Sequence, residues 1–407
     1  MNDKLVDFIN GNWDSCIKQN KLDNGTLIGL PYPYSVPNIG CFDEMYYWDT
    51  YFTNIGLILS GRVMQAKYNV DNMLYLVNRI GFMPNGNRTY YLHNTQPPFL
   101  SEMVKAVYEY FKDKVWLSSA YMILEKEYEF WMNNRISPIG LNIYQGNVMN
   151  DETVNFYAKI YEERTGYKYN DENKKSIARH SITTAESGWD MTPRWGEDAY
   201  NFAPVDLNSL MYGFEKNMEY FCGELGNDSD CWALKADKRK KLMIKYMTSS
   251  EGLLLDYNYK KERLSDILTM ASVYPLFTNM ADREYTEVII DNLSRIKGNY
   301  GMFACEKSES KNIFQWDYPN GWPPHQLIAI KGFDNYGYTD IATELAKSYV
   351  EVVQKNFELT GNLWEKYNMI DGSVNTRQEL NAQDELPEMM GWTAGVYLYA
   401  KHYIDKI

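Results

Sequence analysis

The sequence predicts an all-α protein whose helices form a closed barrel of helical hairpins within one domain, residues 1–407. Helical periodicity dominates the chain: about a dozen segments repeat apolar residues at the three- and four-residue spacing of an amphipathic helix. The loops between these segments differ widely in length, which fits a barrel with long functional loops at one end. No internal repeat of about 34–47 residues is visible, so a helical solenoid is disfavoured.

The expected helices follow one another along the chain with few strand-like segments between them. They cover residues 3–20, 48–62, 63–80, 98–112, 115–134, 205–223, 229–247, 262–275, 282–295, 322–333, 338–356 and 389–404. In 205–223, for example, Leu207, Leu210, Met211 and Phe214 share one face, and Asp206 precedes them as a start signal. A small β-hairpin is expected within residues 136–158.

Composition and charge narrow the classes of function. The net charge of −13 and the pI of about 5.0 argue against binding to nucleic acid or to an anionic membrane surface. A small neutral sugar is compatible with this charge. Aromatic residues make up 15% of the chain, and the rings of Tyr and Trp suit the faces of sugars. The alternative is a chain that uses Tyr where others use Leu or Phe.

The cysteines and histidines give no sign of a metal centre. Five Cys and four His are scattered without ligand-like spacing, so we expect no disulfide framework, no metal and no cofactor. The first fifteen residues are polar and lack the apolar core of a signal peptide, from which we expect a cytoplasmic protein. No stretch approaches the roughly 20 apolar residues of a membrane span. The oligomeric state stays open.

Four loop-like segments crowd Trp, Asp, Glu, Asn and Gln among Gly and Pro. They are residues 37–57, 83–99, 184–195 and 314–326, and weaker segments follow at 363–368 and 386–396. Such residues suit a sugar site: aromatic rings cover the C–H faces of a pyranose, and polar side chains bond its hydroxyls. Hydrolysis of a glycosidic bond needs two carboxyl groups, one that donates a proton and one that is ionised.

These segments resemble the trehalase family of glycoside hydrolases. The stretches YYWDTYF and QWDYPNGWPP match its two signatures, and MPNGNRTYYLHNTQPPF, AESGWDMTPRW and APVDLNSLMY are similar to further family segments. The resemblance runs from about residue 31 to 404 in the family's order, which makes it specific. It implies an (α/α)6 barrel and hydrolysis of α,α-trehalose with inversion of the anomeric centre.

The resemblance also implies roles for individual residues. Asp190 takes the place of the general acid, and burial against Trp189 would favour its protonated form. Glu365 takes the place of the general base. The expected substrate-binding residues are Phe42, Trp48, Asp49, Asn85, Gln96, Arg164, Trp189, Trp316 and Glu388. The alternatives are purely structural roles: a helix cap for Asp190, a solvated residue paired with Lys366 for Glu365, and core positions for Trp48 and Trp316.

Some positions depart from the family pattern. Cys41 and Asn94 stand where the family has sugar-binding arginines, and residues 371–388 replace a glycine-rich lid. These changes fall on the leaving-group side, so an α-glucoside other than trehalose, such as glucosylglycerate or another glucobiose, is the main alternative. A phosphorylase and a non-catalytic sugar-binding protein are further alternatives. The carboxyl group of Glu365 argues against the first, and the presence of both carboxyl groups argues against the second.

Overall fold

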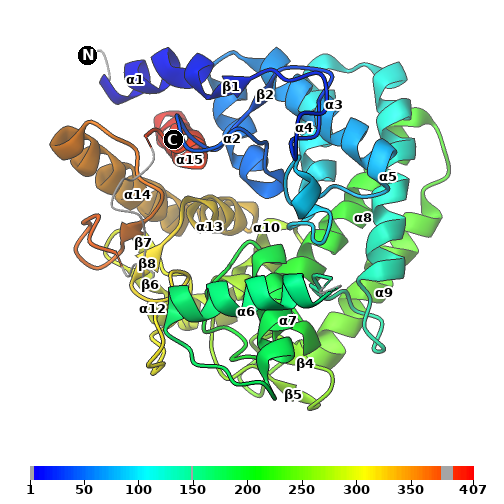
Figure 1. Cartoon of the computed structure of the whole chain (residues 1–407). Coiled ribbons are helices and arrows are strands. Elements are labelled where there is room, and N and C mark those ends of the chain that lie inside the picture. Colours follow the sequence, from blue (N-terminus) through cyan, green and yellow to red (C-terminus); the bar gives the residue numbers. More distant parts are fainter. Residues whose placement is uncertain (1–3, 148–149, 377–387) are drawn as a thin grey trace.

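The computed structural model describes residues 4–147, 150–376 and 388–407. Twelve of its helices alternate between an outer and an inner layer and close into an (α/α)6 barrel (Figure 1). The inner helices are α2 Tyr47–Leu59, α4 Leu100–Phe111, α8 Val205–Leu225, α10 Tyr274–Phe277, α13 Pro323–Asn335 and α15 Gly391–Lys406. The outer helices are α1 Lys4–Asn12, α3 Val63–Ile80, α5 Lys114–Asn134, α9 Asp230–Met247, α11 Arg283–Asp291 and α14 Thr339–Thr360.

An inner and an outer helix, α13 and α14, differ in how much of their surface is buried. The inner helix α13 is buried at every position from Pro323 to Ile330, and its two prolines occupy the first turn, where no backbone N–H is needed. The outer helix α14 buries only one stripe, with Leu345, Tyr349 and Val352 at three- and four-residue spacing. Of these two helices, the inner one is thus buried all around over its first eight residues and the outer one along a single stripe.

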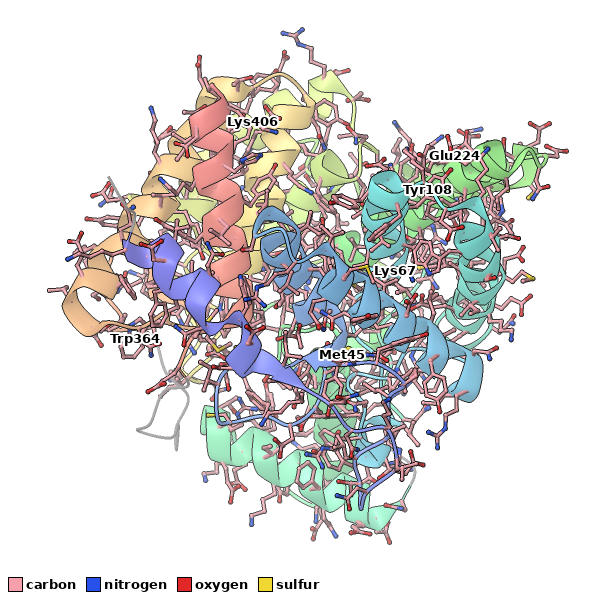
Figure 2. The ribbon with its side chains drawn as sticks, turned by 90° about the horizontal axis from the view of Figure 1, so that it is seen from above. Met45, Lys67, Tyr108, Glu224, Trp364 and Lys406 are labelled. Atoms are coloured by element: carbon pink, nitrogen blue, oxygen red, sulfur yellow. The ribbon has the colours of Figure 1, made fainter. Side chains whose placement is uncertain are left out.

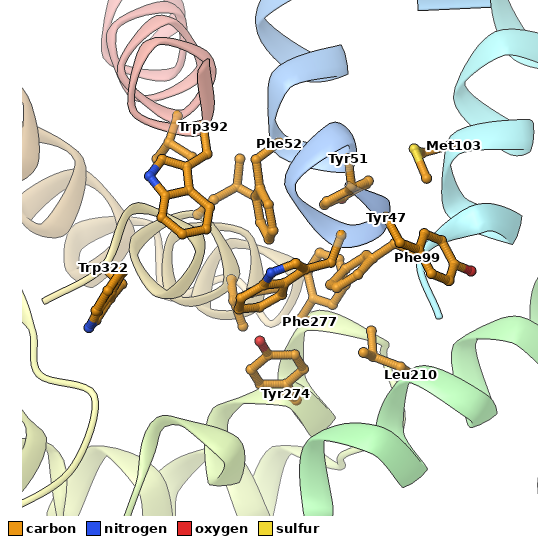
Figure 3. Packing of buried hydrophobic residues seen from close by; sticks show 14 of the residues in the cluster. Tyr47, Tyr51, Phe52, Phe99, Met103, Leu210, Tyr274, Phe277, Trp322 and Trp392 are labelled. Atoms are coloured by element: carbon orange, nitrogen blue, oxygen red, sulfur yellow. The ribbon is translucent and has the colours of Figure 1, made fainter. Parts of the chain in front are cut away.

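Aromatic side chains fill the centre of the barrel. Tyr51 stacks on Phe99 with ring centroids 4.4 Å apart, and the ring of Phe277 of α10 lies 6.4 Å from Tyr51 and 6.3 Å from Phe99 in the same cluster (Figure 3). At the rim, the Tyr108 hydroxyl of α4 donates a hydrogen bond to Glu224 of α8 at 2.6 Å, and these two residues lie side by side in Figure 2. None of the described helices is long and apolar enough to cross a membrane.

The barrel closes where α15 packs against α2. A Cβ atom on Gly395 would lie 2.0 Å from the Phe52 carbonyl oxygen, and one on Gly56 would lie 2.7 Å from the Cα of Gly395. Both separations are far below van der Waals contact, so only glycine lets these two backbones approach so closely. The first and last inner helices are thus joined backbone to backbone.

Two helices, α6 Asp151–Thr165 and α7 Lys174–Glu186, interrupt the alternation and pack on each other beside the ring (Figure 1). Sequence analysis missed both. The expected hairpin at 136–158 is confined to a tight turn that pairs Ile136 with Asn142. Residues 151–158 are helical because Asn150 caps the Thr153 amide and two acidic residues occupy the first turn.

The helix expected at 262–275 is also largely wrong. Residues 263–264 form strand β5, and helical turns begin only at Met270, where the Thr269 side chain accepts a hydrogen bond from the Ala271 amide.

The remaining short elements are α12 Leu293–Ile296, the 3-10 helices η1 Trp13–Cys16, η2 Thr89–Tyr91, η3 Ala199–Asn201 and η4 Met270–Val273, and the strands β1 Ile17–Lys18, β2 Tyr34–Ser35, β3 Phe202–Ala203, β4 Tyr257–Asn258, β5 Arg263–Leu264, β6 Lys297–Gly298, β7 Gly301–Met302, β8 Asn320–Gly321 and β9 Tyr367–Asn368.

One strand pair matters for the site. Strands β8 and β9 pair antiparallel, with Asn320 opposite Asn368 and Gly321 opposite Tyr367. The pair brings residues 314–322 beside residues 363–368, which are far apart in the sequence. Two of the segments picked out by their composition therefore meet at one end of the barrel.

Candidate active site

One cavity of about 900 Å³ is lined by residues from all six segments that the sequence analysis singled out, 37–57, 83–99, 184–195, 314–326, 363–368 and 386–396. Its lining comes from the loop before α2, the 83–99 segment, α6, the turn after α7, the 314–322 segment and the residues around 365 and 390. Nine of the expected site residues line it: Phe42, Trp48, Asp49, Asn85, Gln96, Arg164, Asp190, Trp316 and Glu365. The cavity is near the upper end of the roughly 300–1,000 Å³ typical of small-molecule sites.

Asp190 is held in place from two directions. Its Oδ2 accepts a hydrogen bond from Gln315 Nε2 at 3.0 Å and lies 3.2 Å from Arg164 Nη1 of α6. The turn that presents it contains Gly188 at φ +76°, where a Cβ would come within 2.7 Å of the Trp48 indole. The close contact explains why the turn needs glycine. Asp190 caps no helix among the described contacts; its carboxyl group faces the cavity.

Glu365 reaches the cavity from a bend just before β9. Its Oε2 accepts a hydrogen bond from Lys366 Nζ at 2.6 Å, and its side chain is 31% exposed. The alternative to a catalytic role for Glu365 was a solvated residue paired with Lys366. The structure contains that pair, but Glu365 lines the cavity.

Asp49, in the first turn of α2, is a third carboxyl group at the same cavity. Burial, together with the nearby negative charges of Glu365 and Asp190, raises the pKa of Asp49 to about 7. Near neutral pH a substantial fraction of the Asp49 carboxyl groups is therefore protonated and can donate a hydrogen bond. Three acidic groups in one cavity thus occupy three different environments.

A wall of tryptophans borders the carboxyl groups. Trp316 and Trp322 stack with ring centroids 3.8 Å apart and planes within 4°, and Trp392 meets Trp322 edge-on at 5.8 Å. Trp48 completes this wall against Trp316 at 5.7 Å. Trp48 and Trp316 are at most 2% exposed, so they serve the core as well as the cavity.

Trp189 does not line the cavity, unlike the expectation for a substrate-binding residue. Its ring is fully buried between Trp316, at 5.7 Å, and the guanidinium of Arg194, at 4.4 Å. Arg194 in turn is held by the buried carboxylates of Asp206 and Asp256. Trp189 is therefore a support behind the tryptophan wall.

The 83–99 segment supplies amide side chains to the cavity. Gln96 Oε1 accepts a hydrogen bond from the Trp48 backbone N–H at 3.1 Å, and Asn85 Nδ2 donates to the Thr95 carbonyl at 3.3 Å. Glu186 anchors this segment: its buried carboxylate accepts hydrogen bonds from the Thr95 backbone N–H and from the Arg135 side chain. Asn94, where the family pattern has arginine, also lines the cavity.

Glu388 and Cys41 are not among the residues that line the cavity. Glu388 is exposed, and its backbone carbonyl accepts a hydrogen bond from the Ile39 N–H of the loop before α2 at 3.0 Å. Cys41 is exposed and does not line the cavity, although Phe42 does. Most of the 371–388 segment, residues 377–387, lies outside the described residues.

Helix α6 contributes a wall that the sequence analysis did not foresee, apart from Arg164. Thr153, Tyr157, Ile160 and Arg164 follow one another at three- and four-residue spacing and face the cavity, with Phe156 at their side. The same spacing was the available signal, preceded by the Asn150 cap. It went unnoticed because a helix face that lines a cavity mixes polar and apolar residues and carries no clear apolar stripe.

Acidic side chains outnumber basic side chains in the lining of the cavity. Four acidic side chains line it, Asp49, Glu152, Asp190 and Glu365, and the one Arg or Lys among the described lining residues is Arg164. The guanidinium of Arg164 contacts Asp190. Within the described part of the chain, no group of three or more His, Cys, Asp and Glu side chains could hold a metal ion.

Comparison with known proteins matches this chain to one family. The family model for trehalase matches residues 4–404. The chain is 33% identical over 402 residues to a periplasmic trehalase of Xanthomonas oryzae pv. oryzae, which covers 92% of this chain and 68% of the relative. It is 31% identical to a periplasmic trehalase of Pseudomonas aeruginosa, covering 92% of this chain and 72% of that protein.

Solved structures agree with the fold. Neutral trehalase Nth1 from Saccharomyces cerevisiae superposes with a TM-score of 0.81 at 25% identity, over 98% of this chain and 80% of that one. A GH63 mannosylglycerate hydrolase from Thermus thermophilus has a TM-score of 0.68 at 14% identity, over 97% of this chain and 99% of that one, a likeness of fold alone.

The same comparison corrects the expected location. The cytoplasmic location expected from the polar N-terminal residues is contradicted, because the Xanthomonas and Pseudomonas relatives are named periplasmic trehalases. An export signal is read from a leader that is cleaved from the mature protein. The composition of the folded domain therefore does not reveal its compartment.

Proposed function

Since this chain belongs to the trehalase family and is a glycoside hydrolase, we propose that it hydrolyses α,α-trehalose to two glucose molecules in a single inverting displacement. The proposal rests on one observation above all: Asp190 and Glu365, far apart in the sequence, reach the same tryptophan-walled cavity, each with its own cationic partner. The packing of α15 on α2 further supports one catalytic domain over residues 1–407.

In the proposed reaction Asp190 is the general acid and Glu365 the general base. Glu365 takes a proton from a water molecule as the water oxygen bonds to the anomeric carbon. The bond from that carbon to the glycosidic oxygen breaks, and Asp190 gives its proton to the departing oxygen. The products are β-glucose and the leaving sugar, with Asp190 ionised and Glu365 protonated until both exchange with solvent. An inverting pair stands roughly 6.5–9.5 Å apart to admit the water.

The supports of each carboxyl group fit these roles. Arg164 and Gln315 both contact Oδ2 of Asp190 and would stabilise the carboxylate that forms when the proton leaves. The tryptophan wall would cover the C–H face of the glucose, and Asp49, Asn85 and Gln96 would bond its hydroxyls. Asp49 would act as a hydrogen-bond donor in its protonated state.

The charge of the cavity supports a neutral leaving group. A glycerate carboxylate or an attacking phosphate would need a cation to balance it, and Arg164 is engaged with Asp190. Four acidic residues line the same cavity and would repel an anion. Glucosylglycerate hydrolysis and phosphorolysis are therefore disfavoured relative to trehalose hydrolysis.

A second candidate substrate is a neutral α-glucoside with a less polar leaving group. The proposed general acid, Asp190, faces the leaving group. Since Arg164 of α6 contacts Asp190, α6 lies on the leaving-group side as well. There α6 presents Phe156, Tyr157 and Ile160, and Phe156 is 58% exposed. Such a wall suits an apolar or flat leaving group as well as a sugar ring.

The experiment that tests the proposal is incubation with trehalose, glucosylglycerate, other glucobioses and alkyl α-glucosides, with the first-formed anomer followed by NMR. Cleavage of trehalose with β-glucose appearing first is the expected result. A parallel incubation with phosphate should give no glucose 1-phosphate. Cleavage of glucosylglycerate in preference to trehalose, or α-glucose as the first product, would contradict the proposal.

A further inference from the structure

Lys366 is a buried lysine whose charged end contacts the proposed base. Its side chain is 5% exposed, and Nζ donates to Glu365 Oε2 at 2.6 Å. A buried ammonium group persists only where a partner compensates for its lost hydration. Here the partners are a carboxylate and the face of an indole, since Nζ lies 4.7 Å from the Trp322 ring centroid.

The contact requires a particular backbone. Neighbouring residues in an extended strand point to opposite faces. The side chains of Glu365 and Lys366 meet nevertheless, because the chain bends at Glu365 before β9 begins at Tyr367. Pairing of β9 with β8 then anchors this bend beside Trp322. The local fold therefore brings Lys366 onto the carboxylate.

Trp322 connects this arrangement to the proposed acid. Its indole Nε1 donates to the Gln315 carbonyl at 3.2 Å, and the Gln315 side chain donates to Asp190. One indole thus supports both the cation that holds Glu365 and the amide that holds Asp190. A displacement of Trp322 or Lys366 would change the separation of the two carboxyl groups.

The surrounding charges make such a support necessary. The negative charges of Asp190 and Glu365 both act on Asp49, whose pKa is raised to about 7 by burial and by these charges. Asp190 is paired with Arg164, and Glu365 is paired with Lys366. Without Lys366 the Glu365 carboxylate would lose its 2.6 Å contact and would be free to turn away from the place where the water attacks. A carboxylate that points elsewhere is no longer a usable base.

We propose that Lys366, which lies on the face of Trp322, is a positioning residue that holds the Glu365 carboxylate aimed at the attacking water. The inference rests on the proposed role of Glu365 as the base. Lys366 itself does not line the cavity, so it acts through Glu365 and not on the sugar.

The test compares two substrates that differ in their need for the acid. Trehalose needs both proton donation and water activation. α-Glucosyl fluoride needs only the second, because fluoride leaves without a proton. Lys366→Met keeps the length of the side chain and removes its charge. We expect kcat to fall about 10- to 100-fold on both substrates, with KM within a fewfold of the wild type.

Two further variants separate positioning from general damage. Lys297→Met removes an equally short Lys–Glu contact, 2.6 Å to Glu344, away from the cavity, and should leave both rates unchanged. Lys366→Arg keeps the positive charge and should recover part of the lost kcat. It also serves as the test if Lys366→Met does not fold, with a smaller loss that is equal on the two substrates.

The outcomes distinguish this inference from the proposed function. Wild-type kcat in Lys366→Met, or a loss confined to trehalose in either variant, would overturn the positioning role while leaving the hydrolase proposal intact. A wild-type enzyme that cleaves neither trehalose nor α-glucosyl fluoride would contradict the proposed function itself.

Discussion

At the scale of single residues, the chemistry depends on what each carboxyl group contacts. Asp49, Asp190 and Glu365 line one cavity, yet Asp190 contacts a guanidinium, Glu365 contacts an ammonium, and Asp49 is enclosed by protein with no such contact among the described residues. Identical functional groups thus meet different surroundings. Motifs identified these residues, but not all of their partners: Lys366 follows Glu365 directly, whereas Gln315 reaches Asp190 from 125 positions away.

A variant at Asp190 tests the acid directly. Asp190→Asn keeps the hydrogen-bonding shape and cannot donate a proton to the glycosidic oxygen. We expect trehalose hydrolysis to fall by about 10²- to 10⁴-fold while α-glucosyl fluoride hydrolysis falls much less. Steady-state rates on both substrates check this. Glu163→Gln, an exposed carboxyl variant on α6, serves as the control, and equal losses on the two substrates would remove Asp190 from proton donation.

At the scale of elements, the barrel depends on how closely neighbouring helices approach. Most contacts between the layers use side chains of ordinary size, but α2 and α15 meet through Gly56 and Gly395. The periodicity of α15 predicts a helix from about residue 389 and does not reveal which glycine is needed for packing. The distance to Phe52, a residue more than three hundred positions earlier, decides that.

Gly395→Ala should therefore destabilise the protein. The added methyl group would overlap the Phe52 carbonyl oxygen, and overpacking of this kind costs about 1–3 kcal/mol or more. Gly223→Ala is the matched control: Gly223 lies within α8 with nothing within 4 Å of an added Cβ, and alanine there should stabilise by about 0.5–1 kcal/mol. Urea unfolding measures both. An unchanged midpoint for Gly395→Ala would contradict the proposed backbone contact.

At the scale of the whole molecule, the described helices bury several ionisable groups, and folding stability should depend on pH. Burial raises the pKa of Glu127 to about 8, although the Tyr47 hydroxyl donates to it at 2.5 Å. Burial also lowers the pKa of His180 to about 3. The acid therefore favours folding at low pH, and the histidine favours folding at high pH.

The contribution of Glu127 can be isolated. Between about pH 4.5 and 8 the unfolded chain has lost this proton and the folded chain retains it, so the free energy of unfolding falls as pH rises, by at most about 1.4 kcal/mol per pH unit. Glu127→Gln is neutral in both states and should lack this slope. Its stability relative to wild type should thus increase from pH 5 to pH 8 in urea titrations.

The exposed Glu129 on the same helix provides the control. Glu129→Gln should follow the wild-type pH dependence throughout, because its side chain is solvated in both states. A wild-type slope retained in Glu127→Gln would show that Glu127 is already ionised in the folded protein.

Most of the outer and inner helices, the residue types of the site and the family follow from the sequence alone. Helical periodicity is local, so the sequence predicts helices at residues 63–80 and 205–223 without knowledge of what packs against them. A pair between the adjacent residues Glu365 and Lys366 was also open from the sequence, and the structure adds its place beside the cavity and Trp322. The three-dimensional structure was needed to show that α6 walls the cavity, that Trp189 stands behind it, that Glu388 does not line it, and that Arg164 and Gln315 both contact Asp190. Those facts depend on distances between segments that are separated in the sequence, and such distances are set by packing of the whole barrel and not by spacing along the chain.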